Sequence, residues 1–180
     1  FCLKLKYKIM KKIIMALFIV TAMISCSNET TLEKIKRLEP QMLEASGRLN
    51  KEVCAELVET YQLYAEQNPD EAKSPDYLFM ALDISVNLNA DDSQKTIAIA
   101  DALIEKYPDF EMTPMAMFIK GFVYENMVKD IPLAEKTYRQ FLEKYPDSPM
   151  VKDVEATIEN LGLTPEELVR KFESKNEAAE

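Results

Sequence analysis

The pentapeptide EKYPD occurs at residues 105–109 and again at 143–147, and a looser copy, QNPD, precedes both at residues 67–70. The prolines of the three phrases are separated by 39 and 38 residues. Pro75 and Pro114 each follow the preceding repeat proline by six residues, so the similarity extends beyond the phrase itself. Self-similarity with a period of about 20 to 50 residues is typical of stacked-repeat proteins. The sequence therefore predicts an array of similar units.

Apolar residues recur at helical spacing rather than in alternation. Ile97, Ala100 and Leu103 share one face of a helix, and segments 53–65 and 134–145 repeat the pattern. Intervals of three and four residues place such side chains on one buried side of an amphipathic helix. We therefore predict an all-α protein. The predicted helices lie near residues 30–45, 50–67, 75–88, 93–106, 114–127, 131–144, 149–161 and 165–174.

Helix boundaries have their own signals. A hydroxyl residue followed by proline occurs at four predicted helix starts, namely Ser74-Pro75, Thr113-Pro114, Ser148-Pro149 and Thr164-Pro165. The hydroxyl is expected to cap the helix, and proline fits the first helical position. Glu167 completes a capping box with Thr164, Asp92 and Asp130 indicate further starts, Gly162 suits a left-handed stop, and Pro40 is a candidate break. In each EKYPD copy, tyrosine is the last buried residue and proline ends the helix.

The segment 114–146 resembles a tetratricopeptide repeat. The positions that carry the resemblance are Gly121, Tyr124, Ala134, Tyr138, Phe141 and Pro146, although Phe141 is bulky where alanine is usual. Segment 75–108 is a poorer copy, in which Leu82, Ser85 and Thr96 replace the glycine, the tyrosine and the alanine. The resemblance implies antiparallel helical hairpins stacked as an α-solenoid of about eight helices. It also implies a degenerate first pair at 30–67, a C-terminal capping pair at 149–174 and a disordered tail at 175–180.

Residues 1–25 differ from the rest of the chain, because they contain five lysines and no acidic residue. The uncharged run at 13–25 is shorter than the roughly 20 apolar residues that a helix needs to cross a bilayer. A basic flank followed by a short apolar core is typical of a secretory signal. We therefore expect export, with translation starting at Met10, where Met-Lys-Lys already opens a complete signal.

The apolar run ends at Met23-Ile24-Ser25-Cys26, which resembles the lipobox of bacterial lipoproteins, although Met23 stands where leucine is usual. The resemblance implies that Cys26 carries acyl chains such as palmitate and that residues 26–29 form a short tether. The alternative is an unmodified cysteine beside a cleavage site. Ser27, in place of an aspartate that marks inner-membrane retention, favours the outer membrane facing the periplasm. The phrases at 121–126 and 161–168 also resemble small tetratricopeptide lipoproteins of Bacteroidetes-type bacteria.

Composition argues against several classes of function. Removing the five signal lysines from 22 basic side chains leaves 17 against 31 acidic ones, a formal charge of −14 that would repel nucleic acid. The chain has no histidine, the commonest general base and metal ligand, and no glycine-rich phosphate loop. Cys54 is expected in the core, and paired acids such as Glu166-Glu167 fit helix N-termini. We therefore expect no catalytic site, no metal, no cofactor and no small-molecule substrate.

The resemblance implies a partner-binding surface on the first helix of each pair. Its candidate residues are Met115, Phe118, Phe122 and Glu125 in the better unit and Asp76, Phe79, Asp83 and Val86 in the poorer one. This apolar and acidic set suits an extended or helical segment that carries Lys or Arg, whereas a clamp for a terminal carboxylate would need Lys, Arg and Asn. Phe79 and Phe118 have an alternative role as packing between helices.

The function that these features favour is a lipid-anchored periplasmic scaffold that binds another protein. Its likeness to related lipoproteins implies a role in envelope or outer-membrane assembly. The alternative is a structural or accessory lipoprotein that oligomerises through residues 30–67 without a ligand in the groove.

Overall fold

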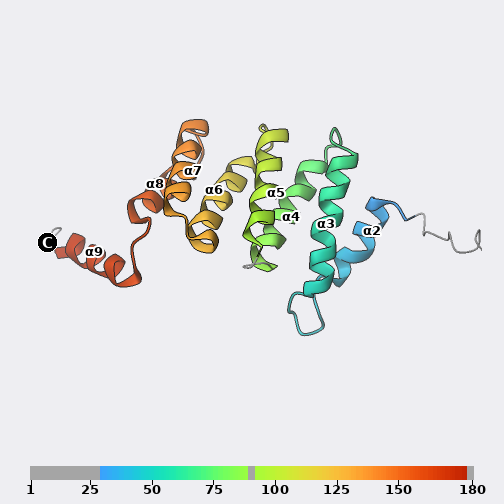
Figure 1. The fold of residues 1–180 in the computed structure, drawn as a ribbon, viewed down its shortest axis with the longest axis horizontal. Helices are drawn as coiled ribbons and strands as arrows, with labels where there is room; N and C mark the ends of the chain where they lie inside the picture. Colours follow the sequence, from blue (N-terminus) through green and yellow to red (C-terminus); the bar gives the residue numbers. More distant parts are fainter. Residues whose placement is uncertain (1–28, 89–91, 178–180) are drawn as a thin grey trace, which may run out of the picture.

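The computed structural model describes residues 29–88 and 92–177, and helices account for most of both ranges. The helices follow one another along the long axis of the molecule, and each packs against the next from α2 to α8 (Figure 1). The elements are α2 (Thr31–Leu38), the 3-10 helix η1 (Glu39–Gln41), α3 (Lys51–Gln67), α4 (Ser74–Leu88), α5 (Ser93–Lys106), α6 (Thr113–Val123), the π-helix η2 (Tyr124–Val128), α7 (Ile131–Lys144), α8 (Val151–Asn160) and α9 (Pro165–Glu177).

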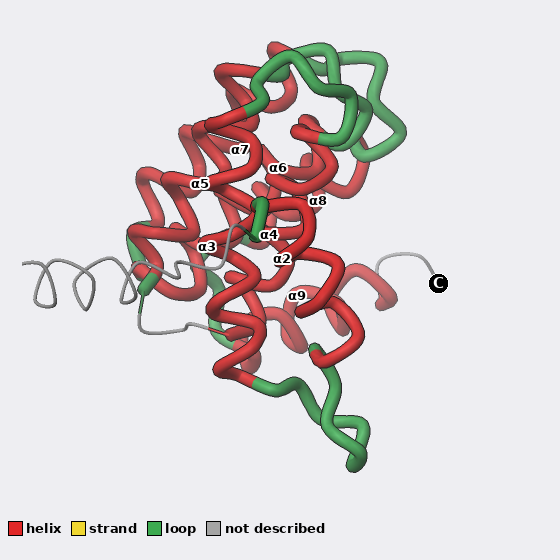
Figure 2. Tube along the Cα trace, turned by 90° about the vertical axis from the view of Figure 1, so that its right-hand side faces the viewer, coloured by secondary structure: helices red, strands yellow, loops and turns green. Residues whose placement is uncertain are grey.

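The helices form two layers. Figure 2 shows α3, α5 and α7 along one side and α2, α4, α6 and α8 along the other. We call the second set the A layer, because it holds the first helix of each pair, and the first set the B layer. The predicted all-α solenoid of hairpins is confirmed.

The duplicated phrase closes the second helix of a pair, as predicted, but its tyrosine is half-buried, and the last buried residues are Ile104 in α5 and Phe141 in α7. Tyr107 ends α5 with φ −130° and ψ 59°, and Tyr145 ends α7 with φ −128° and ψ 55°. Asn68 ends α3 with nearly the same backbone, φ −133° and ψ 57°. Each of the three donates its N–H to the carbonyl four residues earlier. The three helix ends are therefore copies of one local structure at the observed spacing.

The prediction that hydroxyl residues cap the next helix is wrong for Ser74 and Thr113. Each is the first residue of its own helix, and its hydroxyl donates backwards to the last carbonyl of the preceding helix. Ser74 Oγ lies 2.5 Å from the Asn68 carbonyl oxygen, and Thr113 Oγ1 lies 2.6 Å from that of Tyr107. Both hydroxyl residues are fully buried, and each bond satisfies a carbonyl that the preceding helix leaves without an intrahelical partner.

Of the four remaining predicted caps, one is absent and three are present. Ser148 is not the cap of α8, which begins at Val151, and its hydroxyl accepts from the Met150 N–H at 3.3 Å. The predicted capping box of α9 is present, with Thr164 and Glu167 exchanging two hydrogen bonds. Asp92 and Asp130 cap α5 and α7 as predicted.

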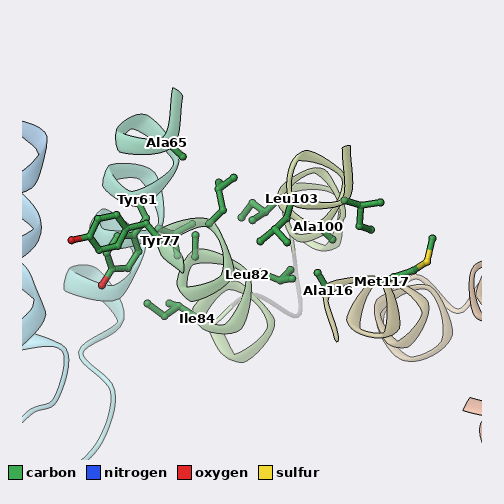
Figure 3. Packing of buried hydrophobic residues seen from close by; sticks show 14 of the residues in the cluster. Tyr61, Ala65, Tyr77, Leu82, Ile84, Ala100, Leu103, Ala116 and Met117 are labelled. Carbon is green, nitrogen blue, oxygen red and sulfur yellow. The ribbon is translucent and has the colours of Figure 1, made fainter. Parts of the chain in front are cut away.

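The two best-formed helical pairs bring their helices close together with opposite placements of the large and the small side chain. In α6 and α7, a Cβ added at Gly121 would overlap the Tyr138 ring, with Cδ1 only 2.7 Å away. In α4 and α5, the corresponding positions carry Leu82 and Ala100, both fully buried. Figure 3 shows Leu82 reaching from α4 to the side on which Ala100 lies. Large and small residues have thus exchanged helices between the two repeats.

The two repeats also differ at a second pair of facing positions. Ser85 and Thr96 are fully buried, and a 2.7 Å hydrogen bond joins their hydroxyls. At the corresponding positions the third repeat, residues 114–146, has Tyr124 and Ala134. The poorer copy of the family pattern is therefore internally complementary rather than degraded.

Three predicted boundaries need correction. The helix expected at 30–45 ends at Leu38 and tightens into η1 at Pro40, because proline cannot donate a hydrogen bond and clashes with the preceding turn. The helix expected at 114–127 changes into η2 after Val123, and Lys129 then ends it in the left-handed region with φ 63°. The disordered tail expected at 175–180 is wrong for 175–177, which continue α9; residues 178–180 lie outside the described ranges.

The C-terminal capping pair expected at 149–174 is also wrong in part. Val154 of α8 is fully buried, so this helix closes the array. In Figure 1, by contrast, α9 extends away from the stacked helices. The bond that ties it back is made by Lys171, whose Nζ donates to the Glu159 carbonyl and to Asn160 Oδ1, both at 2.9 Å.

The crossing of α6 and α7 generates a prediction for a double-mutant cycle. Gly121→Leu should overpack against Tyr138 and cost about 1–3 kcal/mol or more, whereas Tyr138→Ala should leave a cavity and cost about 3–5 kcal/mol. The double variant recreates the Leu–Ala pair of the preceding repeat, so we expect a favourable coupling of about 0.5–3 kcal/mol. Denaturant unfolding of the four proteins measures the coupling, and purely additive costs would contradict this account of the crossing.

Candidate partner-binding surface

Seven of the eight candidate residues lie on α4 and α6, which are neighbours in the A layer (Figure 2), and Glu125 lies on η2, which continues α6. The two sets occupy equivalent positions, because each residue of the second set follows its counterpart on α4 by 39 residues. Asp76 and Asp83 are exposed on α4, and Phe122 is 38% exposed on α6. We call this surface the α4–α6 face.

Three aromatic or aliphatic candidates form the floor of this face. Phe79, Val86 and Phe118 are half-buried and pack against the core. The Phe118 ring lies 5.6 Å from that of Tyr138, with 37° between the planes. These residues therefore pack between helices and also present part of their surface to solvent.

Glu125 has a defined structural partner. Its Oε2 accepts a hydrogen bond from the Tyr138 hydroxyl at 3.0 Å. Burial, reinforced by the charge of Glu125, raises the pKa of Tyr138 above its usual range. The same arrangement occurs at the other end of the array, where the Tyr61 hydroxyl donates to Glu39 Oε1 at 3.0 Å. Glu125 is thus held in one orientation at the edge of the face.

Sequence reasoning missed one residue of the α4–α6 face. Met80 is 37% exposed and lies on α4 between Asp76 and Asp83, at helical intervals of four and three. That spacing alone could have placed it on the same side as the two aspartates. Met80 and Phe122 supply the exposed apolar surface of the face.

The face is also electrostatically one-sided. Within residues 29–88 and 92–177, Asp76 and Asp83 make no salt bridge. The nearest lysine on α6, Lys120, is engaged elsewhere, because its Nζ pairs with Asp101 of α5 and lies 5.9 Å from the centre of the Tyr124 ring. Two carboxylates therefore flank Met80 and remain available to a cationic group.

Met115 differs from the other candidates by lining a pocket of about 570 Å³ at the end of the third hairpin. Its other walls come from the start of α6 and from the loop after α7, and they are largely apolar, including Met112, Pro149 and Met150. Tyr145 of the second EKYPD copy also lines it. The pocket extends the candidate surface toward the loops of the array.

The two EKYPD copies differ in what their tyrosines do. The Tyr107 hydroxyl donates to the carbonyl of Pro69 in the preceding loop at 3.0 Å, and so ties one repeat to the next. The Tyr145 hydroxyl is buried but has no hydrogen-bond partner among the described residues. Identical phrases thus have unequal roles, which depend on the neighbouring repeat rather than on the local sequence.

Metal-binding and membrane-spanning features are absent from the part of the chain that the structure describes. In the ranges 29–88 and 92–177, no group of three or more acidic, histidine or cysteine side chains is placed to hold a metal ion. None of the helices there is both long and apolar enough to span a membrane. Cys54 is fully buried, as expected, and burial raises the pKa of its thiol. Cys26 and residues 1–25, which the sequence predicts to be a signal, lie outside the described ranges.

Helical hairpins stacked in two layers with a common register define an α-solenoid of interaction repeats. The family model of the tetratricopeptide repeat matches residues 115–148, which cover most of α6 and all of η2 and α7. The match identifies this hairpin as a tetratricopeptide repeat, a unit that is typical of scaffolds for protein–protein interaction. No curated protein and no solved structure matches the chain significantly.

The unequal tyrosines generate a matched pair of predictions. Tyr107→Phe removes a hydrogen bond and should lower the free energy of unfolding by about 0.5–1.5 kcal/mol. Tyr145→Phe removes a buried hydroxyl without a partner and should be neutral or stabilising. Denaturant unfolding of the two variants tests this, and equal losses of stability would show that the Tyr145 hydroxyl does have a partner.

Proposed function

We propose that this chain is a lipid-anchored scaffold of the bacterial cell envelope, held at the outer membrane and facing the periplasm, where it binds another protein during envelope or outer-membrane assembly. The observation that carries the binding role is the α4–α6 face, which presents exposed Met80 and Phe122 beside the carboxylates of Asp76 and Asp83. The localisation is supported by the signal-like residues 1–25 and by the lipobox-like sequence at Cys26.

The chemistry of the face indicates what it binds. Methionine and phenylalanine adapt to apolar side chains of different shapes, and the two aspartates would pair with Lys or Arg. The partner is therefore a protein segment with apolar residues and at least one cation. Surface charges steer association more than they add affinity. The rate of association should therefore fall as salt screens the two aspartates.

Photo-crosslinking in the intact envelope tests this role. A photo-reactive residue placed at Phe122 should give discrete crosslinked products, and Asp83→Lys in the same chain should reduce them, because it reverses a charge that the partner contacts. The matched control is the same probe at Leu133, which is 39% exposed on α7 of the other layer. Identical products from both positions, or products indifferent to Asp83→Lys, would contradict binding at this face.

The anchor has a separate test. The intact mass of the protein purified from membranes should exceed that of the chain starting at Cys26 by the mass of its acyl chains, and Cys26→Ser should move the protein out of the membrane fraction. A membrane-purified protein with an unmodified Cys26 would refute the anchor while leaving the scaffold role intact.

A further inference from the structure

The loop between η1 and α3 exposes a pair of leucines that the proposed function does not use. Residues 42–50 form a short hairpin, in which Leu43 and Leu49 make an isolated antiparallel bridge. Leu43 is 60% exposed and Leu49 is 38% exposed. Directly opposite residues of an antiparallel pair project from the same face, so the two side chains form one apolar tip. In Figure 1 this loop protrudes beyond the helices, between α2 and α3.

The hairpin has a fixed structure. The Glu44 N–H donates to the Arg48 carbonyl at 2.8 Å, and Gly47 makes the turn in the left-handed region with φ 79°. At the base, the Asn50 N–H donates to the Met42 carbonyl at 2.8 Å. Met42 itself packs against the core. The leucines are therefore held outward by an ordered support, although burial of an apolar side chain is favourable.

The position of the hairpin in the chain indicates what it meets. The described residues begin three positions after Cys26, and the five residues from Cys26 to Thr31 reach at most about 17 Å when fully extended. Helix α2, which follows, is only about 12 Å long. The 3-10 helix η1 adds about 6 Å, so if Cys26 carries acyl chains, the base of the hairpin stays within about 35 Å of the anchored cysteine and can reach the bilayer surface.

The local charge is compatible with that neighbour. The chain as a whole carries 31 acidic and 22 basic side chains, which would disfavour an anionic membrane surface. The hairpin and the first turn of α3 instead balance Glu44 and Glu52 with Arg48 and Lys51. The apolar tip thus lies in a neutral part of an acidic protein.

We propose that Leu43 and Leu49 insert into the lipid surface to which the chain is anchored. This inference rests on the lipid anchor of the proposed function and gives the protein a second point of membrane contact. Two points restrict rotation about the tether, so they would fix how the α4–α6 face is presented to the periplasm. Apolar side chains that enter a membrane surface lie at the boundary between headgroups and acyl chains. We assign both leucines to that depth.

The chain lacks tryptophan, so a single substitution introduces a specific fluorescent reporter. Leu43→Trp and Leu49→Trp would each be made in the acylated full-length protein and reconstituted into vesicles of phosphatidylethanolamine and phosphatidylglycerol, with and without bromine on the acyl chains. We expect about twofold lower emission in the brominated vesicles, because the reporter sits at acyl-chain depth. The matched control is Leu133→Trp, which is 39% exposed on α7, two helical pairs along the array from the hairpin. Its emission should be unchanged.

The outcomes separate the two proposals. Protein that floats with the vesicles while Leu43→Trp is not quenched would overturn lipid insertion and leave the anchor standing. A blue shift in the presence of vesicles without any loss of emission on bromination would also overturn it, in favour of contact with a second copy of this chain. Protein that neither floats nor carries acyl chains on Cys26 would instead refute the proposed anchor.

Discussion

The space between the two helices of a pair is the constraint on which this structure depends. At each well-formed crossing the pair has room for one large side chain, and the opposite helix must then carry a small one. The third repeat gives the space to Tyr138 and keeps Gly121 bare, whereas the second gives it to Leu82 and keeps Ala100 small. Because interiors are packed as densely as organic crystals, only such compensated pairs preserve the register between hairpins. The regular layers, and hence the alignment of α4 with α6, follow from it.

Features set by local sequence were predictable. The helical stripes, the tyrosine–proline helix ends, the aspartate caps and the capping box of α9 depend on residues a few positions apart, and the structure has them where the sequence indicates. The failures involve partners from different elements. Ser74 and Thr113 have the composition of caps, yet each donates to a carbonyl six residues earlier, because a buried helix end has a more exacting requirement. Taken alone, Leu82 indicates loss of the family pattern, because the small residue that makes room for it, Ala100, lies on another helix.

The candidate surface divides in the same way. Repeat register was sufficient to place seven of the eight residues on two neighbouring helices of one layer and Glu125 on η2, which continues α6. It could not show that Glu125 is held by the Tyr138 hydroxyl, that Phe118 packs against the same ring, or that Met115 lines a separate pocket. Each of these outcomes depends on Tyr138 or Tyr145, which belong to α7 and its end and so lie outside α4 and α6. Met80, by contrast, was within reach of helical spacing alone.

Cys54 has a consequence for how opening of the array can be followed. Its side chain is fully buried in the first helical pair, and burial raises the pKa of the thiol, so an alkylating reagent finds little thiolate at neutral pH while that pair is closed. Within the part of the chain that the structure describes, it is the one free cysteine. Its labelling rate would therefore report opening of the amino-terminal hairpin, and it would not report local opening at the carboxyl-terminal end, where Lys171 of α9 bonds to the end of α8.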